Sequence, residues 1–376
     1  MRNDSNALLI AALAGNCIAV AGWWVQPETI FGLMRGLDLT ETSAGLVASA
    51  EVTMIAFTSI ALGFRGDNSY RQLALLGIGI TLLGHTISIL ASSYALLILL
   101  RLLAGIGEGC LLAAITAVLA SSMDPDRRYA QVTAATVAFQ ACLIALIPWW
   151  IPDYTHTQVF AALSIMTLLL APMVFLLPRN SLDKKSVENV FGLGGTHAYI
   201  LVAATAIWTN GSGAMWAFSV AIGAGTTLDS QQVGTAVGFS TMGGIVGGIV
   251  AAWVGRRWGR FSPLLWAMVV NVIAVYFLVH AANGLLFVVS LATATFCTFF
   301  VYPYLLAAAA ELDSVGGCAA AVGGAFILAG GGGPIFGGML IGWFGGFEGI
   351  AWGLVVCTLV TLGLLSYVKQ RSRILS

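Results

Sequence analysis

The stretch LLILLRLLAGIGEGCLLAAITA, residues 96–117, decides the fold, because it places two charged residues inside a long apolar run. A helix needs about 20 mostly apolar residues to cross the hydrocarbon core of a bilayer, and this run supplies them. Arg101 and Glu108 are seven residues apart, nearly two helical turns, so their side chains share one helix face. A charge that faces lipid costs at least about 3 kcal/mol. We therefore expect this face to contact protein or water. Gly105 and Gly109 lie on the same face and leave it without bulky side chains.

The composition of the whole chain is typical of a membrane protein. Of its 376 residues, 59% are hydrophobic and 9% are charged, whereas a soluble domain averages about 25% charged residues. So few charges could not cover the surface of a water-soluble fold of this length, and the chain needs a lipid bilayer around it. The formal net charge is zero and the basic residues are dispersed, which argues against nucleic acid as a partner.

Twelve apolar runs predict an all-α membrane protein with twelve transmembrane helices. None of the runs alternates with the period of a barrel strand, and lipid admits only helices or closed barrels. The runs lie near residues 7–33, 42–62, 72–91, 95–120, 130–150, 156–178, 198–222, 230–254, 262–281, 284–310, 317–341 and 346–368.

Lys and Arg in the loops predict the orientation, because short cytoplasmic loops are enriched in both. Arg35 lies on one side of the predicted membrane and Arg101 lies within a span. The other 14 of the 16 basic residues lie on the opposite side: Arg2, Arg65, Arg71, Arg127, Arg128, Arg179, Lys184, Lys185, Arg256, Arg257, Arg260, Lys369, Arg371 and Arg373. Both termini are therefore predicted to be cytoplasmic, as an even number of spans requires.

The two halves of the chain resemble each other. The loops GFRGDNSYRQ, residues 63–72, and GRRWGRFSP, residues 255–263, occupy corresponding places, and Arg71 and Arg260 are 189 residues apart. Internal repeats of this kind are typical of transporters in which one bundle moves against the other. We therefore predict two pseudo-symmetric six-helix bundles, in residues 1–178 and 198–376, joined by a cytoplasmic linker in residues 179–197.

These features together resemble the major facilitator superfamily. The loop 63–72 is similar to that family's Gly-x-x-x-Asp-Arg-x-Gly-Arg-Lys motif. Two further features also resemble the family: the Arg followed by a Gly-rich face in residues 96–117, and the loop DPDRRYAQ, residues 124–131. The first loop departs from the motif at Asn68, Tyr70 and Gln72, and the second has Arg256 where the acid would stand. The resemblance implies a conformational gate at the cytoplasmic side, formed by Gly63, Asp67, Arg71, Arg257 and Arg260.

The resemblance also implies which side chains line a central cavity, because spans one, four, seven and ten do so in that family. Aromatic rings with polar edges suit an amphipathic organic solute. The cavity or substrate-binding candidates are Arg101, Asn16, Trp23, Trp24, Gln26, Trp208, Asn210, Trp216, Tyr302 and Tyr304. Trp and Tyr near span ends are equally typical of the membrane interface, so both interpretations stay open for Trp23 and Trp24.

The motif GGGGPIFGG, residues 330–338, is similar to the Gly-Pro-x-x-Gly-Gly motif that antiporters of the family carry in span five. Here it lies in span eleven, the partner of span five by pseudo-symmetry. Two interpretations remain open: the motif sets the direction of transport, or its small residues let two helices pack closely. We favour helix packing through Gly333, Pro334, Gly337 and Gly338.

Charged residues within the spans are the candidates for energy coupling. Glu51 and Arg101 lie at similar depth in spans that run the same way, so we expect an ion pair between them. Glu108 lies deeper and is the first candidate for a carboxylate that exchanges a proton during transport; Glu51 is the second. A permanently charged structural role is the alternative for both acids. Arg101 is interpreted as structural, with a clamp for a substrate carboxylate as the alternative.

Three other ionisable residues receive no functional role from the sequence. His85 is expected to pack against a neighbouring helix, since a lone His in an apolar span is more often packed than titrating. Glu28 and Glu311 lie near span ends and are expected to be solvated.

The sequence thus predicts a secondary active transporter that moves a small, amphipathic organic solute by proton-coupled alternating access. The alternatives are a proton/drug antiporter that exports lipophilic cations, an uptake symporter for organic acids, an uncoupled facilitator and a membrane-embedded enzyme. An enzyme is disfavoured because the four histidines are scattered and no Gly-Lys-Ser/Thr phosphate loop occurs. We expect no cofactor and no metal, a monomer, partners limited to substrate, protons and lipid, and a location in a bacterial inner membrane.

Overall fold

The computed structural model describes residues 6–63, 70–122, 124–150, 154–177, 195–255, 257, 259–312 and 317–371. Within these residues the chain forms α-helices and no β-sheet. Nine of the described helices are long and apolar enough to cross a membrane. The prediction of an all-helical membrane protein is therefore confirmed.

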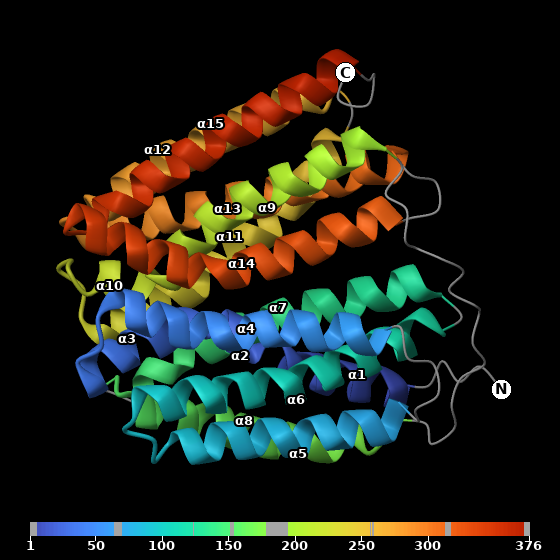
Figure 1. The fold of residues 1–376 in the computed structure, drawn as a ribbon, viewed down its shortest axis with the longest axis vertical. Helices are drawn as coiled ribbons and strands as arrows, with labels where there is room; N and C mark the ends of the chain where they lie inside the picture. Colours follow the sequence, from blue (N-terminus) through green and yellow to red (C-terminus); the bar gives the residue numbers. More distant parts are fainter. Residues whose placement is uncertain are drawn as a thin grey trace. The chain divides into compact units, whose positions relative to one another are not determined.

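The helices, labelled in Figure 1, follow the apolar runs closely. Their bounds are α1 Asn6–Ala19, α2 Ala21–Trp24, α3 Gln26–Leu37, α4 Glu41–Gly63, α5 Tyr70–Ser88, α6 Tyr94–Ala120, α7 Pro125–Trp150, α8 His156–Val174, α9 Thr196–Ala217, α10 Ser219–Gly223, α11 Ser230–Val254, α12 Phe261–Val279, α13 Gly284–Leu312, α14 Gly317–Phe344 and α15 Glu348–Arg371. The runs 7–33, 72–91 and 198–222, which correspond to α1–α3, α5 and α9–α10, are not among the nine candidate spans. The count of twelve spans therefore stays a prediction.

Some of the residues used for the sequence predictions lie outside the described residues. They are Asp67 of the first loop motif, residues 179–194 of the predicted linker, and the basic residues Arg2, Arg65, Arg179, Lys184, Lys185, Arg256 and Arg373.

The first predicted span is divided into the three helices α1, α2 and α3. Pro27 lies at the start of α3 and has no backbone N–H to donate to the preceding turn, which favours a change of helix direction there. Backbone hydrogen bonds from Val20 N to Asn16 O at 3.2 Å and from Val25 N to Ala21 O at 2.9 Å continue the chain across the two junctions. The irregular path places the short helix α2 in the middle of the run.

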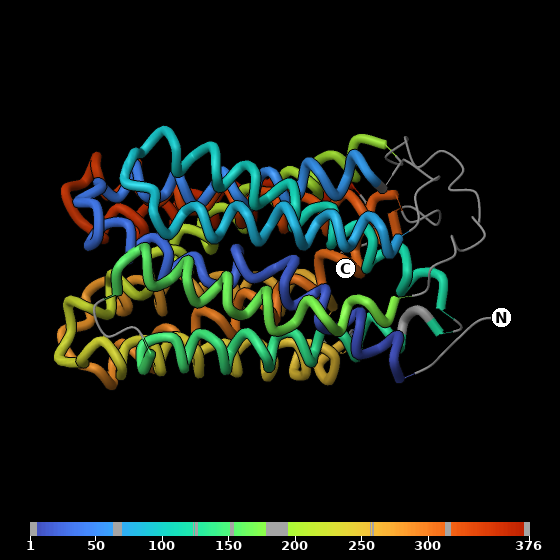
Figure 2. The backbone as a smooth tube through the Cα atoms, turned by 90° about the horizontal axis from the view of Figure 1, so that it is seen from below, coloured from blue at the N-terminus to red at the C-terminus, as the bar shows by residue number. Residues whose placement is uncertain are grey.

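The chain divides into two compact units. The first comprises Met1–Leu39 and Leu46–Ser186, and the second comprises Thr40–Gly45 and Val187–Ser376. Figures 1 and 2 show the long helices within each unit lying side by side with roughly parallel axes. In the first unit α5 packs on α6 and α8, and α1 packs on α6, α7 and α8. In the second, α9 packs on α14 and α15, while α13 packs on α11 and α12.

Glycines on two sides of α6 allow its neighbours to approach closely. Gly105 faces the backbone carbonyl of Glu51 in α4, whereas Gly107 faces α5 on another side. A Cβ atom at Gly107 would lie 2.5 Å from the backbone nitrogen of Thr81 and 2.6 Å from the carbonyl oxygen of Gly77. Both neighbouring atoms belong to backbone, which cannot move aside cheaply. The glycines of α6 therefore bring α4 and α5 close to the helix that carries Arg101 and Glu108.

We expect Gly107→Ala to destabilise the protein by about 1–3 kcal/mol, because the added methyl group overpacks the contact between α5 and α6. Gly79→Ala is the matched control, since a Cβ atom at Gly79 of α5 has no atom within 4 Å. Alanine there should be neutral or stabilise the helix by up to about 1 kcal/mol. Thermal unfolding of the two purified variants in detergent measures both effects. Equal melting temperatures would contradict the packing argument.

Candidate functional site

A buried guanidinium group organises a polar cluster within the first unit. Arg101 of α6 is 0% exposed, and its Nη1 donates to Glu51 Oε1 of α4 at 2.8 Å. Its Nη2 donates to Ser88 Oγ at 2.8 Å and to the carbonyl oxygen of Gly84 at 3.0 Å, both on α5. The ring of Phe160 in α8 lies against the guanidinium group, with its centroid 4.2 Å from Cζ. The expected ion pair between Glu51 and Arg101 is formed.

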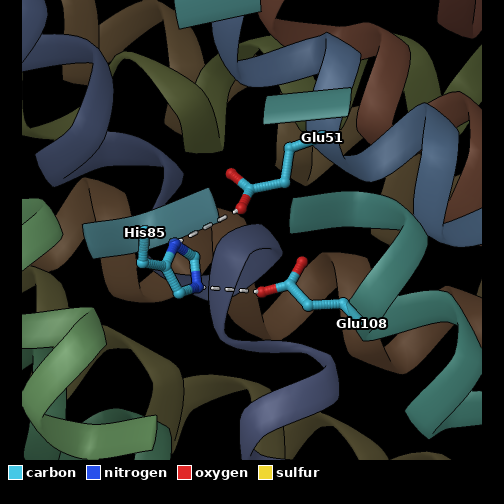
Figure 3. A group of neighbouring side chains, drawn as sticks. All are labelled: Glu51, His85 and Glu108. Atoms are coloured by element: carbon cyan, nitrogen blue, oxygen red, sulfur yellow. Dashed lines mark ion pairs between the residues drawn. The ribbon is translucent and has the colours of Figure 1, made fainter. Parts of the chain in front are cut away.

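His85 of α5 lies between the two carboxylates, as Figure 3 shows. Its Nδ1 is 3.1 Å from Arg101 Nη1 and 4.0 Å from Glu51 Oε1, and its Nε2 is 3.4 Å from Glu108 Oε1. His85 faces a neighbouring helix as expected, but the groups that it meets on α6 are Arg101 and Glu108, which are ionisable. The sequence did contain a signal: Thr81, His85 and Ser88 have the spacing of one helix face in a mostly apolar helix.

Glu108 is buried deep in the same cluster. Its side chain is 0% exposed, and neither carboxylate oxygen accepts a well-aligned hydrogen bond from the described residues. The backbone of Gly22 in α2 lies beside it: a Cβ atom there would be 3.1 Å from Glu108 Oε2 and 2.7 Å from Glu51 Cδ. A larger residue at this position would require the two carboxylates to shift. The break in the first predicted span thus has a local consequence, since it brings Gly22 to the acids.

The charges of the cluster do not balance. Arg101 contributes one positive charge and the two carboxylates contribute two negative charges when both are ionised, which leaves one net negative charge. All of these side chains and His85 are buried. Charges interact strongly at short distance away from water, so the gain or loss of one proton changes the energy of the whole cluster.

Three residues of the cluster are potential metal ligands. Glu51, His85 and Glu108 offer ligand atoms that lie within 4.8 Å of one another, close enough for one ion to reach all three. Imidazole and carboxylate groups are common ligands of transition metals. Arg101 opposes such an ion, because its positively charged Nη1 already donates to Glu51 and lies 3.1 Å from His85 Nδ1. The donor set therefore fits a proton better than a metal ion.

A second buried carboxylate corrects another expectation. Glu28 of α3 is 0% exposed and is not solvated, and neither of its oxygens has a hydrogen-bond partner among the described residues. Burial and the nearby Glu28 carboxylate raise the pKa of Tyr154, which lies in the connection before α8. Proximity to the end of an apolar run predicted exposure, but α3 packs on α8 and covers this end.

The polar candidates of the first predicted span are spread over different contacts. Asn16 Nδ2 donates to Thr136 Oγ1 of α7 at 2.9 Å. Gln26 is 1% exposed, and its amide has no hydrogen-bond partner among the described residues. Trp24 is buried and its ring lies 5.8 Å from that of the half-buried Trp23. Their substrate-binding roles stay predictions.

The candidates in the second unit are also dispersed. Trp208 of α9 is 0% exposed and belongs to an apolar core formed with α12, α13, α14 and α15, and Trp216 of α9 is half-buried. Asn210 Nδ2 donates to the carbonyl oxygen of Ala329 at 3.2 Å. In α13, the Tyr302 ring lies against the Phe326 ring at a tilt, with centroids 4.0 Å apart, and Tyr304 Oη donates to the carbonyl oxygen of Gly255 at 3.0 Å. Their placement leaves the predicted cavity untested.

The predicted gate residues that the structure describes have local partners. Gly63 ends α4, and Arg71 Cζ lies 5.7 Å from the centroid of the Phe175 ring. Arg257 Cζ lies 5.3 Å from the centroid of the Trp253 ring. Arg260 donates from Nη1 and Nη2 to the two carboxylate oxygens of Glu311, each at 2.6 Å, so Glu311 is ion-paired as well as partly solvated.

The Gly-Pro motif of α14 packs against α9. A Cβ atom at Gly333 would lie 2.6 Å from the backbone nitrogen of Ala214, and one at Gly337 would lie 2.9 Å from the Phe218 ring. Pro334 is buried inside α14 next to Gly333, and Gly338 is buried as well. These contacts support the interpretation as helix packing.

The fold and the buried cluster define an integral helical membrane protein whose ionisable groups are held away from water. The family model of the Major Facilitator Superfamily matches residues 10–322, so the chain belongs to that superfamily. The resemblance drawn from the loop motifs and from residues 96–117 is confirmed. Membership of this transporter family favours a transporter over a membrane-embedded enzyme.

Solved structures of transporters share the fold across almost the whole chain. The nucleoside transporter NupG is 13% identical, over 96% of this chain and 99% of its own, with a TM-score of 0.77. A structure from work on substrate recognition in proton dependent oligopeptide transporters is 15% identical, over 97% and 99%, with a TM-score of 0.71. A bacterial homologue of the human lysosomal transporter Spinster, inward-facing and unoccupied, is 12% identical, over 99% and 98%, with a TM-score of 0.68. No curated protein sequence matches the chain.

Proposed function

We propose that this protein is a secondary active transporter that uses the proton gradient to move a small, amphipathic organic solute by alternating access. The observation that carries the proposal is the buried cluster of Glu51, His85 and Glu108 around Arg101. Arg101 forms a direct ion pair with Glu51, whereas Glu108 lies beside His85. Glu108 is therefore the proposed proton carrier and Glu51 the second candidate. The similarity in fold to a structure from work on proton dependent oligopeptide transporters supports proton coupling.

The proposed architecture has twelve spans in two six-helix bundles, residues 1–178 and 198–376, with the linker 179–197 and both termini in the cytoplasm. A bacterial inner membrane is the proposed location and a monomer the proposed state. The alternation between open states would involve the loop residues Arg71, Arg257 and Arg260, together with Gly63 and Asp67. Supporting this, Arg260 is already held in a two-bond ion pair at the start of α12.

For the substrate, we propose a neutral or cationic solute rather than an organic acid. Arg101 is the basic residue within a predicted span, and its two terminal nitrogens already donate to Glu51, Ser88 and Gly84. A guanidinium group engaged in this way is not available to clamp a substrate carboxylate. The aromatic and amide candidates Asn16, Gln26, Trp208, Asn210, Trp216, Tyr302 and Tyr304 would supply contacts to such a solute.

The proposal is tested by transport in proteoliposomes that contain the purified full chain. Nucleosides, lipophilic cations and organic acids are offered under an imposed pH gradient. We expect one neutral or cationic solute to accumulate against its own gradient, and a protonophore to collapse the accumulation to equal concentrations on both sides. Liposomes without protein are the control. Equilibration that is the same with and without the pH gradient would indicate an uncoupled facilitator and refute proton coupling.

A further inference from the structure

We infer that Arg101 fixes His85 as the neutral tautomer with its proton on Nε2, so that His85 directs an N–H at Glu108 and positions this carboxylate. The tautomer follows from contacts within the first unit alone, whereas its effect on transport rests on the proposed function. His85 is thereby a positioning residue for the proton site.

Arg101 has enough N–H donors to serve both Glu51 and His85. A guanidinium group has five N–H donors and no acceptor, and Nη1 carries two of the hydrogens. One of them serves Glu51 Oε1 at 2.8 Å, and His85 Nδ1 lies 3.1 Å from the same nitrogen. An N–H on Nδ1 would point one donor at another. Nδ1 is therefore the acceptor of the second Nη1 hydrogen.

The doubly protonated ring does not fit the same contact. A charged imidazolium carries a hydrogen on both nitrogens, so its Nδ1 would again face the N–H of Arg101. It would also place a second positive charge 3.1 Å from Nη1 in a buried site. The neutral ring has one N–H, and with Nδ1 as acceptor this hydrogen is on Nε2.

The Nε2 hydrogen is directed at Glu108. Nε2 is 3.4 Å from Glu108 Oε1, a close approach without the alignment of a hydrogen bond, and the two side chains face each other in Figure 3. Glu51 Oε1 is 4.0 Å from Nδ1, and these two acceptors share the same Arg101 nitrogen. The two acids therefore have different partners. The partner of Glu51 is the positively charged guanidinium group of Arg101, and the partner of Glu108 is the neutral N–H of His85.

The ionisable groups beside the imidazole are Glu51 of α4 and Arg101 and Glu108 of α6. Ser88 of α5 and the Phe160 ring of α8 contact Arg101, and the backbone of Gly22 in α2 lies beside both acids. Arg101 is the cation of this set. The tautomer of His85 is thus determined by one neighbour.

The tautomer of His85 also determines which ion the site accepts. A neutral imidazole has one lone pair in the ring plane, and Arg101 uses it, so none remains to ligate a metal. An ion approaching Glu108 would meet the Nε2 hydrogen. The geometry therefore selects a proton over a metal cation at Glu108.

Nitrogen-15 NMR of the full chain with labelled histidine, in lipid, tests the tautomer without reference to transport. The spectrum of the His85→Gln variant identifies the His85 signals, since His156, His197 and His280 remain. We expect a protonated Nε2 and an unprotonated Nδ1. A protonated Nδ1, alone or with Nε2, would overturn the inference. Excess zinc should leave the melting temperature unchanged, and a zinc-dependent rise that His85→Gln removes would also overturn it.

Two substitutions test the positioning role through the pH profile of transport. The amide of Gln reaches the place of Nε2 and retains a donor to Glu108, whereas the shorter Asn reaches only the place of Nδ1. An N–H that lies beside a carboxylate favours its charged form, and we expect the loss of this N–H to move the titration of Glu108 by about one pH unit. We expect His85→Gln to keep the wild-type profile, and His85→Asn to move the midpoint upward by about one unit, because a carboxylate without its donor keeps its proton to higher pH. Identical profiles for the two variants would refute positioning, while loss of proton coupling in the wild type would refute the proposed function instead.

Discussion

Glu108→Gln is expected to abolish accumulation of the solute against its gradient while leaving solute exchange intact. Gln has nearly the size of Glu and keeps the packing beside Gly22, but it cannot gain or lose a proton. One pH unit is a tenfold difference in proton concentration, so coupling of one proton to one solute sustains about tenfold accumulation. The accumulation ratio in proteoliposomes should fall from about ten to about one. Counterflow between labelled and unlabelled solute should continue, since it needs no net movement of protons.

The control for this result is Glu348→Gln. Glu348 begins α15, its side chain is 63% exposed, and it pairs with His280 in the second unit. Removal of that charge should leave the accumulation ratio unchanged. If Glu108→Gln still concentrates the solute, Glu108 is not the coupling group. Glu51→Gln would then be the next variant, because Glu51 is the other carboxylate of the cluster.

Arg101→Gln should cause the largest loss of stability of any single change in the first unit. The substitution leaves Glu51 buried without its counter-charge and leaves the Gly84 carbonyl and Ser88 without their donor. Removal of one partner of a buried ion pair costs about 3–5 kcal/mol. The expected result is a large drop in melting temperature in detergent and in the yield of folded protein. Contact with Phe160 is lost as well.

A double variant separates the charge from the packing. Arg101→Gln combined with Glu51→Gln removes the uncompensated carboxylate and should recover part of the lost stability. Arg257→Gln is the control, because the side chain of Arg257 is exposed and lies over the face of the Trp253 ring. A melting temperature for Arg101→Gln equal to that of Arg257→Gln would show that the buried ion pair does not support the fold.

Much of the fold could be predicted from the sequence, because the bilayer requires apolar runs of a certain length. The run 95–120 and helix α6 agree within one residue at each end, and the pairing of Glu51 with Arg101 followed from their similar depth. What the pattern could not predict is where a long run changes direction. The run 7–33 is mostly apolar, and Pro27 is its one residue that cannot donate a backbone hydrogen bond within a helix, yet the run divides into α1, α2 and α3.

The rest of the site depends on approaches between helices, which spacing along one helix does not contain. Gly105 and Gly109 were placed on one shallow face, but the structure uses Gly107 as well, on another side of α6. That second side is what brings His85 to the acids. The burial of Glu28 could not be predicted for a similar reason, because it results from the contact of α3 with α8 and not from the neighbours of Glu28 in sequence.

Gly22 has an implication for how this protein could change over time. A Cβ atom there would require the ends of the Glu51 and Glu108 side chains to shift, so the position favours glycine while both acids stay. A relative that has lost its dependence on an energy source would be free of that constraint. Alanine or serine at this place, together with shorter neutral residues at positions 51 and 108, would therefore mark a descendant that equilibrates its cargo passively.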